Sequence, residues 1–291
     1  SSKIEHHAVT HTLDQLAIDY PIKISYVKLD ELGNVDYNDL EFILKSSNSK
    51  TLVSLMHINN ELGNILDINL VSNLCNQYES LFHSDTVQTV GHYKLDLSSL
   101  KIDFLVASAH KFHGPKGIGF AYINKKNPIK PLIFGGSQEK GCRAGTESVH
   151  NIVGMSEALD ISIDKIDAET EYIKNLKSYF IDQLKDNIKG IKFNGTSSDL
   201  EYSTYTLVNV RFPIIKDESA LFLFQLDMKG IACSKGSACQ SGSDSGSHVL
   251  NNILSDEENK FVSLRFSFSI YNTLEEVDYV ISQLKELLVN N

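Results

Sequence analysis

The sequence predicts an α/β fold in which helices cover the faces of a mainly parallel sheet. In the first half of the chain, short apolar runs alternate with stretches of helical amphipathic spacing. Such alternation is typical of parallel strands joined by helical crossovers. A long charged amphipathic segment, residues 164–189, then leads into a shorter α+β portion. We therefore expect a large domain at residues 1–163 and a small domain at residues 164–291.

The elements of both predicted domains follow from apolar spacing and from the turn residues between apolar stretches. Apolar positions three and four apart indicate a helix, and short apolar runs that end in polar residues or glycine indicate a strand. On this basis we expect, in the large domain, strands at residues 23–29, 51–57, 81–83, 104–108 and 117–123 and helices at 37–45 and 67–78, and in the small domain a strand at 206–212, a helix at 218–229, a strand at 262–269 and a closing helix from residue 274.

Composition narrows the class of protein. The 291 residues include 27 Lys and Arg against 37 Asp and Glu, a formal net charge of −10 at pH 7. This acidity argues against a nucleic-acid partner. An ordinary soluble surface explains it, and attraction of a basic protein partner is the alternative. No apolar run reaches the length of a membrane span, and the first residues lack the apolar core of a signal peptide. The four cysteines form no Cys-x-x-Cys pair, so we expect a reducing, cytoplasmic location and no metal site.

The segment from Ser108 to Gly119 carries the most informative residue, Lys111. It follows an apolar run and presents Lys111 in a turn of small residues closed by Gly114 and Pro115. A lysine amine placed there can condense with a carbonyl, and enzymes commonly use the aldehyde of pyridoxal phosphate (PLP) in this way. A basic surface loop explains this segment equally well, so other positions have to separate the two interpretations.

Two upstream segments favour the PLP interpretation. Asp85 ends a short apolar strand, and PLP withdraws electrons effectively only while a carboxylate keeps its ring nitrogen protonated. The alternative for Asp85 is a cap of the next turn. Gln88 lies three residues further on, within reach of the phenolic oxygen of the ring. The segment Met56–Gly63, which contains Asn60, also runs from a strand into polar residues, at the sheet edge where α/β folds bind ligands.

A third segment, residues 231–248, is rich in serine and glycine and carries Cys239. Its composition predicts a flexible loop. Structural cysteines occupy apolar elements, whereas a thiol on a polar loop is accessible and can act as a nucleophile. A loop cysteine without a role is the alternative.

The remaining histidines and cysteines beside predicted elements are expected to be structural. Histidines in or next to strands more often pack or satisfy a hydrogen bond than catalyse. A cysteine on an amphipathic helix or among apolar residues behaves as a small core residue. These residues are His57, His83, His92, Cys75 and Cys233.

Together these segments resemble the cysteine desulfurases, which are PLP enzymes of class V aminotransferase-like fold, and in particular the branch that serves iron-sulfur cluster assembly and nitrogen fixation. The match runs in order from Glu5 to the last predicted helix and so covers nearly the whole chain. The motifs that carry the resemblance are Glu5–Val9, Met56–Gly63, Ser84–Gln88, Ser108–Lys111, Arg143–Thr146, Gly236–Cys239 and Leu264–Ser267.

The resemblance implies how the cofactor would be held. Lys111 would bind PLP covalently and move protons, and His6 would stack on the ring and take part in proton transfer. The other cofactor contacts that it implies are Asp85 at the ring nitrogen, Gln88 at the ring oxygen, and Ser108 and His110 at the phosphate.

The resemblance also implies the roles of the residues that meet substrate and partner. Asn60 and Arg265 would bind the carboxylate of L-cysteine, Arg265 by the two-pronged geometry that suits a planar anion. Cys239 would take the sulfur as a persulfide while the substrate leaves as L-alanine. The persulfide would then supply an acceptor or scaffold protein in iron-sulfur cluster or thio-cofactor synthesis. Thr146 would reach the phosphate in the neighbouring subunit of a homodimer.

The sequence departs from the family at its N-terminal end. The family carries roughly a hundred residues before the segment that matches Glu5, about one domain of chain. They include a loop at a helix N-terminus that cradles the phosphate. We therefore expect the chain to be part of a longer enzyme. Two alternatives stay open: a PLP enzyme resembling selenocysteine lyase, and a truncated homologue without cofactor that serves as a binding or sulfur-relay protein.

Overall fold

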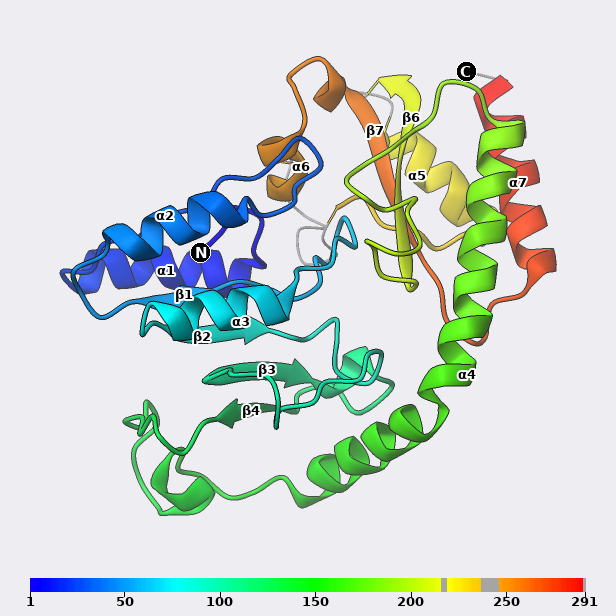
Figure 1. Cartoon of the computed structure of the whole chain (residues 1–291). Helices are drawn as coiled ribbons and strands as arrows, with labels where there is room; N and C mark the ends of the chain where they lie inside the picture. Colours follow the sequence, from blue (N-terminus) through cyan, green and yellow to red (C-terminus); the bar gives the residue numbers. More distant parts are fainter. Residues whose placement is uncertain (216–218, 237–245, 290–291) are drawn as a thin grey trace. The chain divides into compact units, whose positions relative to one another are not determined.

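The computed structural model describes residues 1–215, 219–236 and 246–289, which form two compact units (Figure 1). The first unit comprises Ser1–Ser46, Ile58–Asp67 and Asp167–Asn291, and the second comprises Ser47–His57 and Ile68–Ile166. The chain therefore passes between the units more than once. The domain division at residues 163 and 164 stays a prediction.

The second unit is built on a four-stranded sheet of order β1-β2-β3-β4. Parallel pairing joins β1 (Leu52–Ser54), β2 (Leu81–Asp85) and β3 (Phe104–Ser108), while β4 (Gly119–Ile123) runs antiparallel to β3. The crossover helix α3 (Ile68–Gln77) packs against β2. Because the first three strands are parallel, their carboxyl ends lie at one edge of the sheet.

The first unit contains an antiparallel sheet of order β5-β6-β7. Apolar side chains of β6 and β7 pack against three helices in one core, which includes Leu184, Phe212, Leu226 and Leu284. The strands and packed helices are β5 (Lys192–Phe193), β6 (Leu207–Ile215), β7 (Phe261–Ser267), α5 (Ser219–Met228), α7 (Leu274–Val289) and the second half of α4 (Val149–Asn187). The described residues of this unit also form α1 (His7–Asp19), α2 (Tyr37–Ser46), α6 (His248–Ile253) and the 3-10 helix η5 (Glu258–Lys260).

The α/β class is confirmed, and most predicted elements form within a few residues of their expected bounds. The strand expected at residues 23–29 is wrong. In that segment Val27 donates its N–H to the carbonyl of Ser1 (2.9 Å), and Leu29 makes only an isolated bridge to Val35. The long helix begins at Val149, well before the expected residue 164. The sequence does not predict helix α1, because its apolar residues form only a weak face. In the structure none of its residues is buried.

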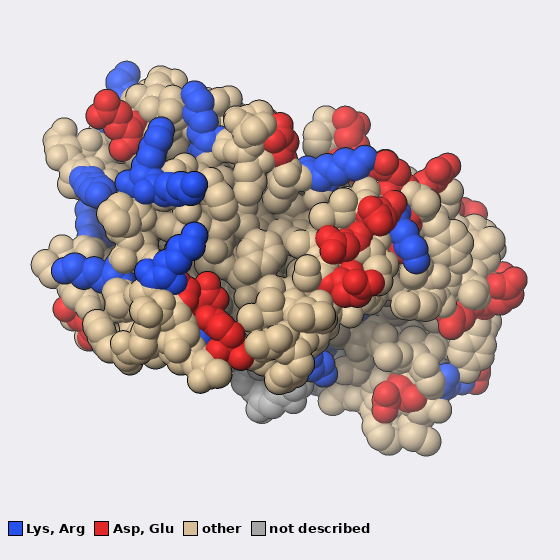
Figure 2. Space-filling view, turned by 90° about the horizontal axis from the view of Figure 1, so that it is seen from below, with Lys and Arg blue, Asp and Glu red and all other residues tan. Residues whose placement is uncertain are grey.

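Charged side chains lie mostly at the surface, and Figure 2 shows both basic and acidic groups there. In the described part of the chain, Glu5, Glu61, Lys177 and Arg211 are buried. Each needs a local partner, because an unpaired buried charge costs several kcal/mol, on the order of a protein's whole stability. No helix among the described residues has both the length and the apolar character to cross a membrane.

Candidate active site

Lys111 lies in a short turn whose neighbours are anchored in the core. Strand β3 ends at Ser108, and a 3-10 helix, η1 (Ala109–Lys111), follows. Ala109 and Phe112 are completely buried, whereas Lys111 between them is exposed. The N–H groups of Phe112 and Gly114 both donate to the carbonyl of Ala109, at 3.0 and 2.8 Å. The backbone of this turn is therefore fixed, and its lysine is directed away from the core.

Gly91 and His92, in the same unit, contact this turn. Gly91 adopts φ 83°, and a Cβ built on it would lie 2.4 Å from the Cβ of Phe112. The next residue, His92, bonds through Nε2 to the carbonyl of Lys111 at 2.9 Å. A carbonyl oxygen can only accept, so Nε2 carries the proton. Burial is the largest cause that lowers the pKa of His92, which favours this neutral form. Sequence reasoning treated His92 as a packing residue and missed this contact.

Asp85 is the last residue of β2 and pairs with Val106 in the register of β3. Its Oδ1 accepts the N–H of Val87 at 3.0 Å, so one oxygen does cap the following turn. The second oxygen, Oδ2, still offers acceptor sites. The carbonyl of Asp85 accepts the N–H of His57 at 3.0 Å, which joins the ends of two adjacent chain segments.

His57 and His83 have hydroxyl partners, as expected of structural histidines. The Nδ1 of His57 lies 3.0 Å from the hydroxyl of Thr89, and that of His83 lies 2.8 Å from the hydroxyl of Ser54. Burial lowers the pKa of His83, opposed by the carboxylate of Asp85. Both imidazoles therefore make hydrogen bonds within the unit that contains Asp85.

One edge of the sheet gathers most of the predicted cofactor residues. Asp85 and Gln88 follow β2, while Ser108 and Lys111 end or follow the neighbouring parallel strand β3. His110 belongs to the same turn as Lys111, and partial burial followed by the charges of Lys111 and Lys116 lowers its pKa. An amine, a carboxylate and a set of neutral donors thus stand at the carboxyl ends of parallel strands, where α/β sheets bind ligands.

Thr146 belongs to the same unit and lies in an exposed turn. Arg143 closes that turn by donating to the carbonyl of Gly145 (2.8 Å) and pairing with Glu147 (2.6 Å). Gly145 adopts φ 112°, which favours glycine. The side chain of Thr146 is therefore presented on an ordered surface turn.

The predicted substrate residues belong to the first unit, where two of them meet. Arg265, in β7, donates through Nη1 to the backbone carbonyl of Asn60 at 2.6 Å. Both residues are half-buried. A guanidinium is a planar group whose paired N–H donors suit a carboxylate.

His6 also belongs to the first unit and caps the N-terminus of α1. Its Nδ1 accepts the N–H of Ala8 at 3.1 Å, so the proton of the neutral ring is on Nε2. Cys239 lies outside the described residues.

The thiols of Cys75 and Cys233 are poor nucleophiles. Burial raises the pKa of both Cys75 and Cys233 to about 12. The nucleophile and metal ligand is the thiolate, which these residues do not form near neutral pH.

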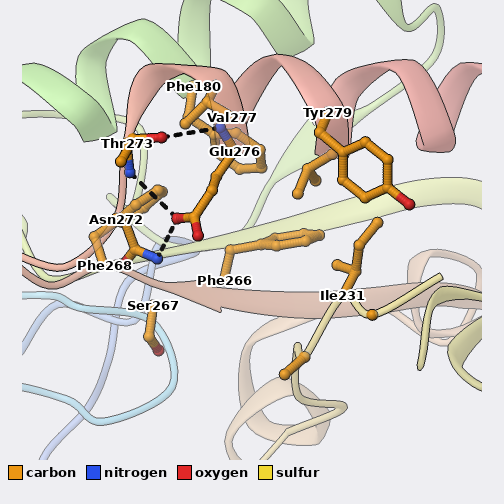
Figure 3. Close-up of a pocket in the computed structure, with 13 residues that line it drawn as sticks. Phe180, Ile231, Phe266, Ser267, Phe268, Asn272, Thr273, Glu276, Val277 and Tyr279 are labelled. Atoms are coloured by element: carbon orange, nitrogen blue, oxygen red, sulfur yellow. Dashed lines mark hydrogen bonds between the residues drawn. The ribbon is translucent and has the colours of Figure 1, made fainter. Parts of the chain in front are cut away.

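The first unit contains a pocket of about 320 Å³ (Figure 3). Aromatic side chains including Phe180 and Phe266 line it, and Glu276 in its wall accepts from Asn272 at 3.0 Å. Of the predicted site residues that the structure describes, none lines this pocket.

Comparison with known proteins assigns the family. The family model described as "Aminotransferase class-V" matches residues 1–280. The chain is 40% identical to "Cysteine desulfurase IscS" of Dictyoglomus turgidum, over 99% of its own length and 71% of that protein. This chain belongs to the cysteine desulfurases of the class V aminotransferase family. "Putative cysteine desulfurase IscS 1" of Bacillus subtilis is 39% identical over 95% of the chain and 71% of that protein.

Solved structures of this family share the fold. A structure titled "NIFS-LIKE PROTEIN" aligns with a TM-score of 0.88 at 34% identity, over the whole chain and 74% of that protein. A NifS-like protein from Rickettsia africae aligns with a TM-score of 0.86 at 31% identity, over 99% of the chain and 74% of that protein. Class V aminotransferases use PLP, and the donor set at the ends of β2 and β3 fits that cofactor.

Proposed function

We propose that this protein is a PLP-dependent cysteine desulfurase. It takes sulfur from L-cysteine, releases L-alanine and keeps the sulfur as a persulfide on Cys239. The persulfide then passes to an acceptor or scaffold protein for iron-sulfur cluster or thio-cofactor synthesis. The observation that carries this proposal is the placement of Asp85 and Lys111 at the carboxyl ends of adjacent parallel strands.

Residues of the second unit hold the cofactor. Lys111 supplies the amine for the aldehyde, and Asp85 pairs with the ring nitrogen through the oxygen that Val87 leaves available. When bound, PLP supplies an electron sink that weakens the bonds around the α carbon of the substrate. The further contacts from this unit are Gln88 at the ring oxygen and Ser108 and His110 at the phosphate. His6, a residue of the first unit, is the one that stacks on the ring in this proposal.

The fixed turn around Lys111 matters for proton transfer. Buried neighbours and the bond from His92 hold the backbone, so the freed amine returns to one place after substrate has bound. A general base held in position needs no ordering at the moment of reaction, which lowers the barrier. Lys111 removes the proton from the α carbon in this arrangement.

The substrate carboxylate is bound by Asn60 and Arg265. The bond between Arg265 and the backbone of Asn60 sets the orientation of the guanidinium before substrate arrives. A preset two-pronged donor binds a carboxylate with less loss of side-chain freedom than a mobile one.

Cys239 carries the sulfur transfer. Its thiolate attacks the sulfur of the substrate, a sulfur–sulfur bond forms, and the bond from sulfur to the β carbon breaks. The bonding electrons stay with the substrate carbon skeleton, which gains a proton and leaves as alanine. The pKa values of Cys75 and Cys233, about 12, argue against these two thiols as the nucleophile.

The active enzyme is a homodimer in a reducing, cytoplasmic setting. Apolar residues at positions 129–134 support an interface, since Leu132 is 94% exposed and Phe134 is 82% exposed. Thr146 follows this stretch and reaches the phosphate of the second subunit. A reducing compartment is supported by the need for a free thiol at Cys239.

Borohydride reduction followed by peptide mapping tests the proposal. The label should appear on Lys111 in the yellow holoenzyme, and Cys239→Ser should abolish persulfide formation while leaving that label unchanged. Normal sulfide release by Cys239→Ser would contradict the role of the thiol. A colourless protein without label would favour a non-catalytic binding protein, and turnover of selenocysteine with little turnover of cysteine would favour a lyase.

A further inference from the structure

The described ends of the segment that carries Cys239 meet at one buried carboxylate, Glu61. The described chain stops at Gly236 and resumes at Gly246. A Cβ built on Gly236 would lie 3.2 Å from the Cβ of Ser247 and 3.5 Å from Oε2 of Glu61. Ser247 in turn donates its hydroxyl to Oε2 of Glu61. All of these residues belong to the first unit.

Glu61 is an unusual choice of residue for packing alone. Its side chain is completely buried. Oε2 accepts from Ser247, while Oε1 has no hydrogen-bond partner among the described residues. Burying a carboxylate costs more than burying an apolar residue of similar size, so packing alone does not account for a glutamate at this position.

The backbone of Glu61 is held independently of its side chain. Its N–H donates to Oδ1 of Asn59 at 2.9 Å, and its carbonyl accepts from Asn209 at 3.0 Å. The carbonyl of the preceding residue, Asn60, accepts from Arg265. Removing the side chain of Glu61 should therefore leave the substrate-binding pair in place.

The upstream end of the segment is tied to the same arginine. Ser234 and Arg265 exchange two backbone hydrogen bonds, at 3.1 and 2.7 Å. Ser247, at the downstream end, accepts the N–H of Leu250 at 3.1 Å and so caps α6. The upstream end is thus bonded to Arg265, and the downstream end is bonded to Glu61, the residue after Asn60.

We propose that Glu61 is a positioning residue for sulfur transfer. By binding Ser247 it holds Ser247 and the neighbouring Gly236 in place relative to the Asn60–Arg265 pair, and these are described residues on either side of Cys239 in the chain. This inference rests on the proposed function, because it needs Cys239 as sulfur acceptor and Arg265 as carboxylate ligand. Glu61 itself does not contact the reacting atoms.

Two reactions of the holoenzyme separate positioning from a structural role. Persulfide formation from L-cysteine needs the thiol of Cys239. Loss of SO₂ from L-cysteine sulfinate uses the same carboxylate site but needs no thiol, because SO₂ leaves as a neutral molecule and its bonding electrons stay on carbon. Glu61→Ala and Ser247→Ala should each slow single-turnover persulfide formation about tenfold, since small misplacements of reacting groups have effects of this order. Sulfinate turnover and the KM for cysteine should stay unchanged.

Matched variants complete the experiment. Glu61→Gln keeps an acceptor oxygen for Ser247 and should retain most of the rate. Ser263→Ala removes another buried hydroxyl of the same unit, which bonds to Asn194 at 2.9 Å, and should affect neither reaction. Tryptic cleavage after Lys235 should be faster in Glu61→Ala than in the wild type, a readout that does not depend on catalysis.

The outcomes are distinct. Equal loss of both reactions in Glu61→Ala and Ser247→Ala would make Glu61 merely structural, and unchanged persulfide formation would overturn the proposal outright. Either result, with Cys239→Ser inactive and Lys111 labelled, would leave the desulfurase function standing. Persulfide-independent sulfur release by Cys239→Ser would instead remove the proposed function itself.

Discussion

Replacing Lys177 should change how stability depends on pH. Lys177 is completely buried in α4 and donates to the hydroxyl of Ser203 (2.6 Å) and the carbonyl of Thr204 (2.7 Å). Burial lowers its pKa from 10.5 to about 7, opposed in part by Asp199. A neutral amine can still donate two protons, so both bonds survive deprotonation.

The direction in which stability changes with pH follows from the number of protons that each state binds. Between about pH 7 and pH 10.5 the unfolded chain holds the proton on Lys177 and the folded chain does not. Raising the pH through this window therefore stabilises the folded wild type. At about 1.4 kcal/mol per pH unit, the full window corresponds to roughly 5 kcal/mol. Below pH 7 both states are protonated and the penalty is constant.

Lys177→Met keeps most of the side-chain volume and removes the titrating group. It loses two hydrogen bonds, at about 1 kcal/mol each, but avoids the cost of the buried amine near neutral pH. The free energy of unfolding of the variant, relative to the wild type, should therefore fall by several kcal/mol between pH 7 and pH 10. Urea titrations over this range measure it, with Lys165→Met, an exposed lysine on the same helix, as control. A difference that stays constant with pH would refute the reasoning.

Two further substitutions test individual contacts. Gly91→Ala should lower the melting temperature more than Gly117→Ala. Both sites have φ near 80°, but only at Gly91 would a Cβ meet Phe112. Overpacking of this kind costs about 1–3 kcal/mol. Equal losses of melting temperature in the two variants would contradict the packing argument. Hydrogen bonds from Ser255, and then an arginine ion pair, lower the pKa of Glu258 below 4.5. Glu258→Gln should therefore be less stable than the wild type above pH 4.5, and acid titration of both proteins should show the gap closing as the pH falls.

Local sequence patterns predict the part of the site that local structure builds. The ends of β2 and β3 came from apolar runs bounded by polar residues, and these runs place Asp85 and Lys111 at one edge. The turn between buried Ala109 and Phe112 is also encoded within a few residues. The chemical roles of Asp85 and Lys111 came from the family resemblance and not from the apolar runs or the turn.

Contacts between distant residues could not be predicted in this way. Arg265 and Asn60 are 205 positions apart, and Ser247 and Glu61 are 186 apart. Only the folded chain brings such pairs together, and no local periodicity encodes their bonds. The prediction of a strand at residues 23–29 was wrong for a related reason. An apolar run becomes a strand only when a neighbouring strand pairs with it.

The route of the chain between the two units bears on its synthesis. All of the second unit has been made once the ribosome passes Ile166, whereas the first unit needs chain from both before and after it. Ile4 and Leu62 share a cluster with Val249 and Leu250, which are translated much later. These early apolar side chains stay uncovered during most of translation, a period in which nascent proteins depend on chaperones.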